Sequence, residues 1–202
     1  MSESWPETLT VRERLVEAAA QLFARRGFAS TSIGEVAQAA GILKGNVAYY
    51  FKSKDDLLTA VIHAQRDRLM AELQPPAAEA GDDVRSAVMR LLRQVRGSAA
   101  DLALHGCPVG SLAGEMGRTH AARHADAAGL LLGLETFLHQ QFERVMPAGD
   151  ARRCAEHLLA LLQGAAVLAQ AHRDAGVVER QVDQAEVWLD TVLARFPASA
   201  KR

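Results

Sequence analysis

The sequence is poor in aromatic residues and in residues that break or crosslink a chain. Aromatics make up 5% of the 202 residues, and there are only 6 prolines and 2 cysteines. β-Branched residues are sparse beside abundant alanine and leucine, a balance that favours helices over sheets. Hydrophobic residues reach 49%, enough to bury a core in a chain of this length. The composition therefore predicts an all-α protein with one large or two modest domains.

Other absences restrict the class of protein and its compartment. No run of 18 uncharged apolar residues occurs, so no membrane-spanning segment is expected. The N-terminus has no basic and then apolar leader, so no secretory signal is expected either. Two cysteines, Cys107 and Cys154, are too few for a disulfide framework, which favours a reducing cytoplasm. Glycine-rich phosphate loops, Gly-x-Ser-x-Gly and His-Glu-x-x-His are all missing from the sequence. We therefore expect no enzymatic activity and no cofactor.

The segment from residue 30 to residue 58 is the most informative part of the chain. Apolar residues at helical spacing predict a first helix that ends at Gly27. Thr31 is expected to cap a second helix, which Gly41 ends, and a third helix should run over 44–51. Ser53 is expected to cap a long fourth helix. Two short helices joined by a glycine turn form a helix-turn-helix, whose second helix enters the major groove of DNA.

Side chains at the start and margins of the third helix suit this partner. Gly45 lets the backbone come close to DNA, Asn46 can bond a base edge or a phosphate, and Lys44 supplies a donor. Three lysines and no acidic residue lie between Gln38 and Lys54, so the local field is positive. The predicted DNA-binding residues are Thr31, Lys44, Gly45, Asn46, Tyr49, Tyr50, Lys52 and Lys54. The alternatives are a solvated helix end for the charges and a core position for one of the tyrosines.

The chain resembles the TetR family of bacterial repressors from Leu9 to about Leu69. The residues that carry the resemblance are Ala20, Phe23, Gly27, Phe28, Thr31, Ile33, Val36, Ala37, Ala40, Gly41, Lys44, Gly45, Asn46, Tyr50, Phe51, Lys54, Leu57 and Leu58. The resemblance implies an all-helical protein of about nine helices. A three-helix DNA-binding domain would cover 9–69, with the helix-turn-helix at about 32–51. A larger domain over 70–202 would bind a small-molecule effector and form a homodimer.

Two residues of the predicted helix-turn-helix depart from the family pattern. Leu43 stands where the family often has a serine that caps the third helix, and Ala48 stands where it usually has a tyrosine. Lys44 or water would have to meet the uncapped donors, and Tyr49 could replace the missing tyrosine at a phosphate. Both departures are expected to alter operator preference without removing DNA binding.

Dimerisation is expected through the last two helices, over 150–175 and 177–196. Leucine and alanine crowd residues 158–169 and leave more apolar surface than one small domain hides. Small residues such as Gly164 and Ala165 permit close helix packing, so a four-helix bundle across a two-fold axis would bury this surface. An ordinary monomer core is the alternative.

An apolar effector pocket is expected in the larger domain. Its candidate residues, each of which could instead be plain core, are Leu102, Cys107, Met116, Leu134, Phe137 and Leu161. Cys107 precedes a short helix whose dipole could lower the thiol pKa, so a thiol sensor is one hypothesis and a packing role the other. His120 and His124 stand four residues apart and could hold a metal, but this spacing is common in exposed helices, so no metal is predicted. The rival classes are a helical enzyme and a helical interaction module that no longer binds DNA.

Overall fold

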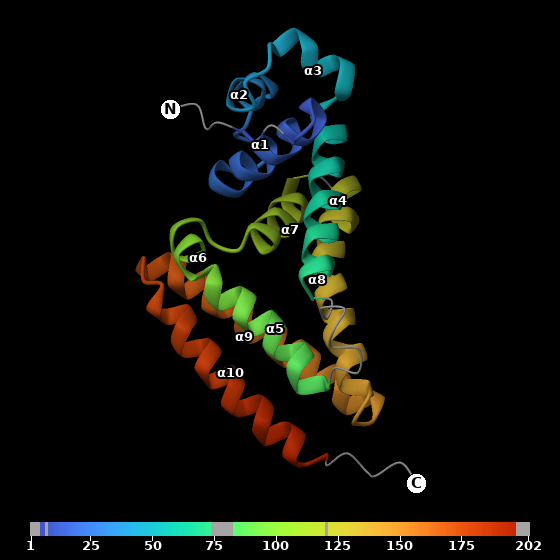
Figure 1. Ribbon diagram of the computed structural model, residues 1–202, viewed down its shortest axis with the longest axis vertical. Coiled ribbons are helices and arrows are strands. Elements are labelled where there is room, and N and C mark those ends of the chain that lie inside the picture. The colour runs from blue at the N-terminus through green and yellow to red at the C-terminus, as the bar shows by residue number, and fades with distance from the viewer. Residues whose placement is uncertain (1–4, 7, 74–82, 120, 197–202) are drawn as a thin grey trace. The chain divides into compact units, whose positions relative to one another are not determined.

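The computed structural model describes residues 5–6, 8–73, 83–119 and 121–196, and every regular element in these ranges is an α-helix (Figure 1). The helices are α1 (Val11–Arg26), α2 (Ile33–Ala39), α3 (Lys44–Tyr50), α4 (Lys54–Leu73), α5 (Val84–Gly97), α6 (Ala99–His105), α7 (Pro108–Thr119), α8 (Ala121–Glu143), α9 (Ala148–His172) and α10 (Gly176–Ala194). The predicted all-α class is confirmed.

The chain folds into two compact units. The first contains Met1–Arg68 and Pro108–Leu130, and the second contains Leu69–Cys107 and Leu131–Arg202. Helices α4 and α8 each pass from one unit to the other. The first unit thus holds nearly all of the segment 9–69 that was expected to bind DNA. It also holds α7, which the sequence-based division placed with the larger domain.

Side-chain caps explain where several helices begin. Thr10 and Glu13 form a capping box at α1, in which the Glu13 carboxylate accepts the Thr10 backbone N–H at 2.8 Å. The Ser53 hydroxyl accepts the N–H of Asp56 at 3.0 Å at the start of α4. The carboxylate of Asp83 accepts the N–H of Ser86 at 2.7 Å at the start of α5. The predicted cap of α4, Ser53, is confirmed.

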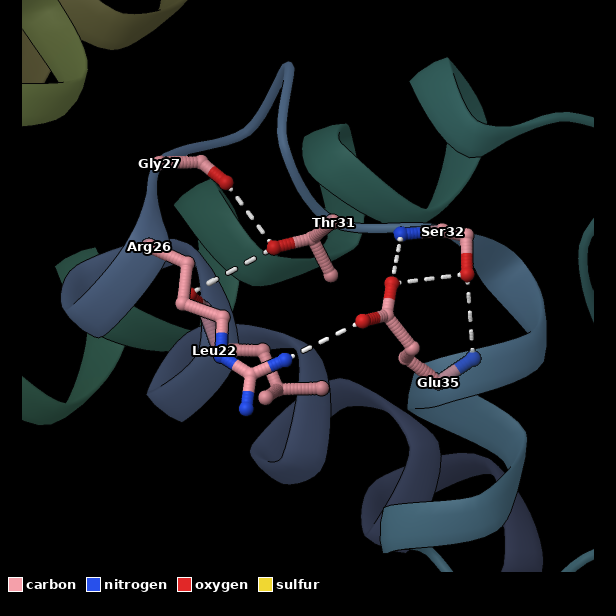
Figure 2. Close-up of polar contacts among 6 residues, drawn as sticks. All are labelled: Leu22, Arg26, Gly27, Thr31, Ser32 and Glu35. Carbon is pink, nitrogen blue, oxygen red and sulfur yellow. Dashed lines mark hydrogen bonds and ion pairs between the residues drawn. The ribbon is translucent and has the colours of Figure 1, made fainter.

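The cap of α2 is Ser32 and not Thr31 as predicted (Figure 2). The Ser32 hydroxyl accepts the N–H of Glu35 at 3.2 Å, and the Glu35 carboxylate accepts the N–H of Ser32 at 2.8 Å. Thr31 is only 1% exposed, and its hydroxyl donates to the carbonyl of Gly27 at 2.8 Å. The helix starts one residue later than expected because the buried threonine bonds backwards to the end of α1.

The first unit packs α1 against α2 and α7, and α2 against α3. The rings of Phe23 and Phe28 meet edge to face with centroids 5.2 Å apart, at the point where the chain leaves α1. The apolar side chains buried in α1 to α4 and the loops between them include Leu15, Ala18, Ala19, Phe23, Phe28, Val36, Ala37, Ala40, Val47, Phe51, Leu57, Leu58, Val61 and Ile62.

The second unit has one apolar core, to which α5, α6, α9 and α10 contribute most of the residues. Figure 1 shows α10 running beside α5 and α9, in agreement with the residue contacts among these helices. Ion pairs from Arg85 to Asp190, at 2.7 Å, and from Arg96 to Asp183, at 2.7 Å, join α5 to α10. These charged pairs lie at the exposed edge of an interface that burial of apolar side chains stabilises.

The helices of this part of the chain differ in three places from what the local sequence predicts. Apolar residues at helical spacing from Val84 to Leu102 predict one helix, but Ser98 divides it into α5 and α6 directly after Gly97. Asp150 is a predicted helix cap, but α9 already begins at Ala148, so the carboxylate lies in the first turn beside Arg153. The nearly continuous apolar run over 130–138 predicts a helix buried on all sides, but Leu132 of α8 is 56% exposed.

Candidate nucleic-acid interface

A tight turn sets the direction of α3. Gly41 adopts a left-handed φ of 69°, which favours glycine, and the N–H of Ile42 donates to the carbonyl of Ala37 at 2.8 Å. Val47, 1% exposed, is the buried residue that fastens α3 to the rest of the first unit. Because α3 is held by one face, its opposite face and its first turn are open to solvent.

The predicted base-reading residues lie on this open surface. Lys44, Gly45 and Asn46 are all exposed in the first turn of α3. A Cβ atom added at Gly45 would meet nothing within 4 Å, so the fold itself does not require glycine there. The free space instead permits another molecule to approach the backbone, as base edges do in a major groove.

Tyrosine and lysine side chains lie at the far end of α3. Tyr49 is 87% exposed, and its ring packs edge to face on the half-buried Tyr50, with centroids 5.1 Å apart. Lys52 is exposed between α3 and α4. The first turn of α3 contains no acidic residue. These side chains can donate to the phosphates that border a groove.

Lys54 has partners inside the unit. Its ammonium donates to the carbonyl of Ala29 at 3.4 Å and lies 4.2 Å from the centre of the Phe28 ring. Burial lowers the pKa of Lys54 below its ordinary value, while the neighbouring charge of Glu115 opposes the shift. Lys54 is therefore held against the loop that joins α1 to α2.

Thr31 does not belong with these residues, in contrast to the prediction. Its side chain is buried and its hydroxyl donates to the carbonyl oxygens of Gly27 and Leu22, as Figure 2 shows. Its backbone N–H donates to the carbonyl of Phe28 at 3.1 Å. With both donors used inside the unit, Thr31 supports the loop and offers nothing to a phosphate.

Glu115 of α7 fixes the same loop, and the sequence analysis missed it. Its two carboxylate oxygens accept the consecutive N–H groups of Phe28, at 2.8 Å, and Ala29, at 2.7 Å. Gly27 has a φ of 84°, and a Cβ atom there would stand 3.1 Å from the carboxylate. Glycine thus serves both the backbone angle and the approach of the carboxylate. The bonded residues are 86 or more positions apart in sequence, so no local pattern could have found the contact.

The predicted effector residues do not all belong to one unit. Leu102 and Leu134 are buried in the core of the second unit, and Phe137 and Leu161 are partly buried against it. Met116 is fully buried in the first unit instead. The described structure therefore assigns core positions to these residues, and their contact with an effector stays a prediction.

The sequence offers Cys107 as a candidate thiol sensor and His120 and His124 as a histidine pair that could hold a metal. Cys107 is half-buried and packs against the core of the second unit, and its role as a thiol sensor stays a prediction. Burial raises the pKa of the Cys154 thiol, as expected for a packing residue. His120 and the side chain of His124 lie outside the described residues. Within the part that is described, no cluster of three metal-ligating side chains occurs.

Apolar side chains reach the surface of the two C-terminal helices. Val167 and Leu168 of α9 and Val187 of α10 are about half to two-thirds exposed. A Cβ atom added at Gly164 of α9 would meet nothing within 4 Å, which leaves room for a neighbouring helix. Large apolar side chains left exposed on the two packed helices α9 and α10 are available to contact another protein.

Comparison with known proteins agrees with this geometry. Residues 15–61 match the model of bacterial regulatory proteins of the tetR family. Residues 82–184, about half of the chain, match the C-terminal domain of LmrA/YxaF-like transcriptional regulators.

Similar proteins of known name are transcriptional regulators. BetI of Stenotrophomonas maltophilia is 29% identical over 159 residues, which are 76% of this chain and 78% of that protein. AcuR of Cereibacter sphaeroides is 30% identical over 152 residues, which are 75% and 67% of the two chains. A TetR regulator from Legionella pneumophila shares the fold, with a TM-score of 0.77 at 19% identity over 89% of this chain and 99% of that one. The chain therefore belongs to the TetR family of DNA-binding transcriptional regulators, with a tetR-type helix-turn-helix followed by an LmrA/YxaF-like C-terminal domain.

Proposed function

We propose that this regulator is a homodimeric repressor that a small-molecule effector releases from its operator. The observation that carries the proposal is the open surface of α3, where Lys44, Gly45 and Asn46 are exposed while Val47 holds the helix in place. On duplex DNA these residues would meet base edges, and Tyr49 and Lys52 would meet phosphates. Tyr50 and Lys54, which are partly buried, would border the contact.

Two copies are needed because one short helix makes few base contacts. A two-fold dimer presents two reading helices to half-sites one helical turn apart, about 34–36 Å, or a multiple of that. The exposed Val167, Leu168 and Val187 support an interface through α9 and α10. In that interface the apolar side chains of one protomer would cover those of its partner, within the predicted range 150–196.

The effector would act by a shift between two populations of the dimer. A ligand that binds one state more tightly than the other changes operator affinity by that difference and by no more. The partly buried Cys107, Phe137 and Leu161 support an apolar or weakly polar effector, because they lie at the margin of an apolar core. Leu102 and Leu134 lie deeper in the same core.

We also propose that the protein works in the cytoplasm, where its DNA is found. One described helix, α9, is long and apolar enough by length and composition to cross a membrane. Several of its residues, including Ala155, Leu158 and Leu162, are buried in the core of the second unit. These buried residues support a role for α9 in the protein core and the dimer.

A mobility-shift assay tests the DNA-binding part of the proposal. The duplex is the region upstream of the protein's own gene, and the competitor is a scrambled duplex of equal length. We expect selective binding. The logarithm of its association constant should fall linearly with the logarithm of the salt concentration, by about 0.9 for each phosphate that a lysine or arginine neutralises. Asn46→Ala should weaken selective binding, whereas the exposed control Arg93→Ala in α5, outside both proposed interfaces, should leave it unchanged. Equal binding to both duplexes would contradict the proposal.

Sedimentation of the free protein at micromolar concentration tests the dimer. A mass of two chains is expected, and a mass of one chain would contradict the proposed assembly. Repression and release are tested in a reporter strain, where deletion of the gene should raise transcription from the bound promoter. Lowered transcription after deletion would indicate an activator instead.

A further inference from the structure

The start of the reading helix differs from the starts of α1, α2 and α4 in the same unit. Threonine or serine hydroxyls cap α1, α2 and α4, through Thr10, Ser32 and Ser53. Leu43 occupies the N-cap position of α3, and no side chain caps this helix. A hydroxyl at this position would accept a free N–H of the first turn, which leucine cannot do.

Leu43 also gains nothing from the core. It is 77% exposed, although leucine is among the side chains most often buried in proteins. A missing cap and an exposed leucine are two unfavourable choices for the folded chain at one residue. Local rules are broken in this way mainly at functional sites, where the compensating contact is made with another molecule.

The surroundings of Leu43 indicate which molecule makes that contact. Lys44 and Asn46, in the first turn that follows Leu43, are exposed on the polar surface proposed to face DNA. The open space at Gly45 allows the helix start to approach base edges closely. In a major groove the one apolar group on a base edge is the C5-methyl of thymine, or the same methyl of 5-methylcytosine. An aliphatic side chain at the tip of a reading helix is the complement of such a methyl.

We infer that Leu43 is a specificity-determining residue that contacts the 5-methyl group of a pyrimidine in each half-site. The inference rests on DNA binding by α3. It extends the reading surface by an apolar contact, which specifies a base without hydrogen bonds. Leu43 is thereby distinguished from Lys44 and Asn46, whose donors and acceptors serve the polar part of the same surface.

The first experiment compares the sites that three proteins select from a random duplex library: the wild type, Leu43→Ala and Leu43→Ser. We expect the wild type to prefer thymine at one position in each half-site and both variants to lose that preference. The matched control is Leu132→Ala, which removes an exposed leucine from α8 and should retain the preference. Leu43→Ser should fold at least as stably as the wild type because it restores a cap, which separates loss of contact from loss of fold.

The second experiment changes only the methyl group. Deoxyuridine in place of the preferred thymine of one half-site should weaken wild-type binding about fourfold, the effect of burying one carbon fewer. The same replacement should leave the affinity of Leu43→Ala unchanged. Replacing thymine by cytosine and then by 5-methylcytosine separates the two sources of the methyl. Recovery with 5-methylcytosine supports the methyl contact, and a preference for thymine alone shows that its carbonyl is read as well.

Failure of this inference differs from failure of the DNA-binding role. A wild type that selects no sequence would overturn both. Selective binding in which deoxyuridine affects the wild type and Leu43→Ala equally would overturn the methyl contact only. Unaltered base preference in Leu43→Ala would do the same.

Discussion

In the first unit, neighbouring residues of similar chemistry differ in whether they are buried or exposed. Thr31 and Ser32 are neighbours with hydroxyl side chains, yet one is buried beneath the α1–α2 loop and the other caps α2 on the surface. Both could have been assigned to a phosphate from sequence alone. Their bonds inside the protein, to Gly27 and to Glu35, assign them to the stability of the fold instead.

At this scale, Thr31→Val should destabilise the fold without altering how the protein contacts DNA phosphates. Valine keeps the shape of threonine but leaves the carbonyl of Gly27 without its donor, at a cost of about 1–3 kcal/mol. Denaturant unfolding measures the loss, and the affinity of the folded variant for DNA at fixed salt should keep the wild-type value. Ser32→Ala is the matched variant, expected to lose about 1 kcal/mol with its cap. Weaker DNA binding by folded Thr31→Val alone would restore the phosphate role.

Helices and loops in this protein are joined by polar contacts distant in sequence. Phe28 and Ala29, near the start of the α1–α2 loop, donate their N–H groups to Glu115 of α7, and Lys54 of α4 donates to the carbonyl of Ala29. The loop is thus attached to two helices that are remote along the chain. Its geometry depends on α7 as much as on its own sequence.

Removing the Glu115 carboxylate should therefore loosen the loop. In Glu115→Gln the amide group cannot accept both N–H groups, so we expect a loss of about 1–2 kcal/mol. Amide exchange at Phe28 and Ala29 should become faster in the variant. Glu179→Gln, an exposed substitution of the same kind in α10, is the control and should change neither quantity. Unchanged exchange at both amides in Glu115→Gln would show that the loop keeps its conformation without the Glu115 hydrogen bonds.

The capping boxes of α1 and α2 predict how stability responds to acid. Hydrogen bonds from Thr10 lower the pKa of Glu13, and those from Ser32 lower the pKa of Glu35, below the ordinary 4.5. A carboxylate with a lowered pKa in the folded state stabilises the fold above the pKa of the unfolded chain. That contribution is lost as pH falls through the lower, folded value.

We therefore expect the free energy of unfolding to decline as pH drops below about 4.5, and Glu35→Gln to decline less steeply. Denaturant unfolding at a series of pH values measures the slopes. If the free energy of unfolding fell equally steeply with pH in the wild type and in Glu35→Gln, the capping box of α2 would not be the cause.

At the scale of the whole molecule, the proposed dimer depends on a surface that one chain leaves open. Leu168 of α9 is about half exposed. A two-fold dimer interface would contain this residue from both protomers and would bury both copies. Leu168→Glu should thus raise the dimer dissociation constant about a hundredfold, since two buried leucines contribute roughly 3 kcal/mol or more. Sedimentation equilibrium measures the constant, and operator affinity should fall with it. Leu132→Glu on α8 is the control, expected to remain dimeric, and a dimeric Leu168→Glu would place the interface elsewhere.

The sequence by itself determined the helical class, the helix-turn-helix and most helix starts. These features rest on local rules, such as the spacing of apolar residues, the glycine at Gly41 and the hydroxyl at Thr10, which act within a few residues. The exposure of Lys44, Gly45 and Asn46, the proposed DNA-reading residues, follows from the same local pattern, because a short helix anchored at Val47 leaves its opposite face in solvent.

Only the tertiary structure decided which hydroxyl caps α2, where α5 ends and what holds the α1–α2 loop. Thr31 is buried because the loop turns back on α1, and no local preference distinguishes it from Ser32. Glu115 reaches the loop across more than eighty residues of chain, a separation at which composition and spacing carry no information. Burial and long-range hydrogen bonds are properties of the packed molecule, and they separate the residues that support the reading helix from those free to meet DNA.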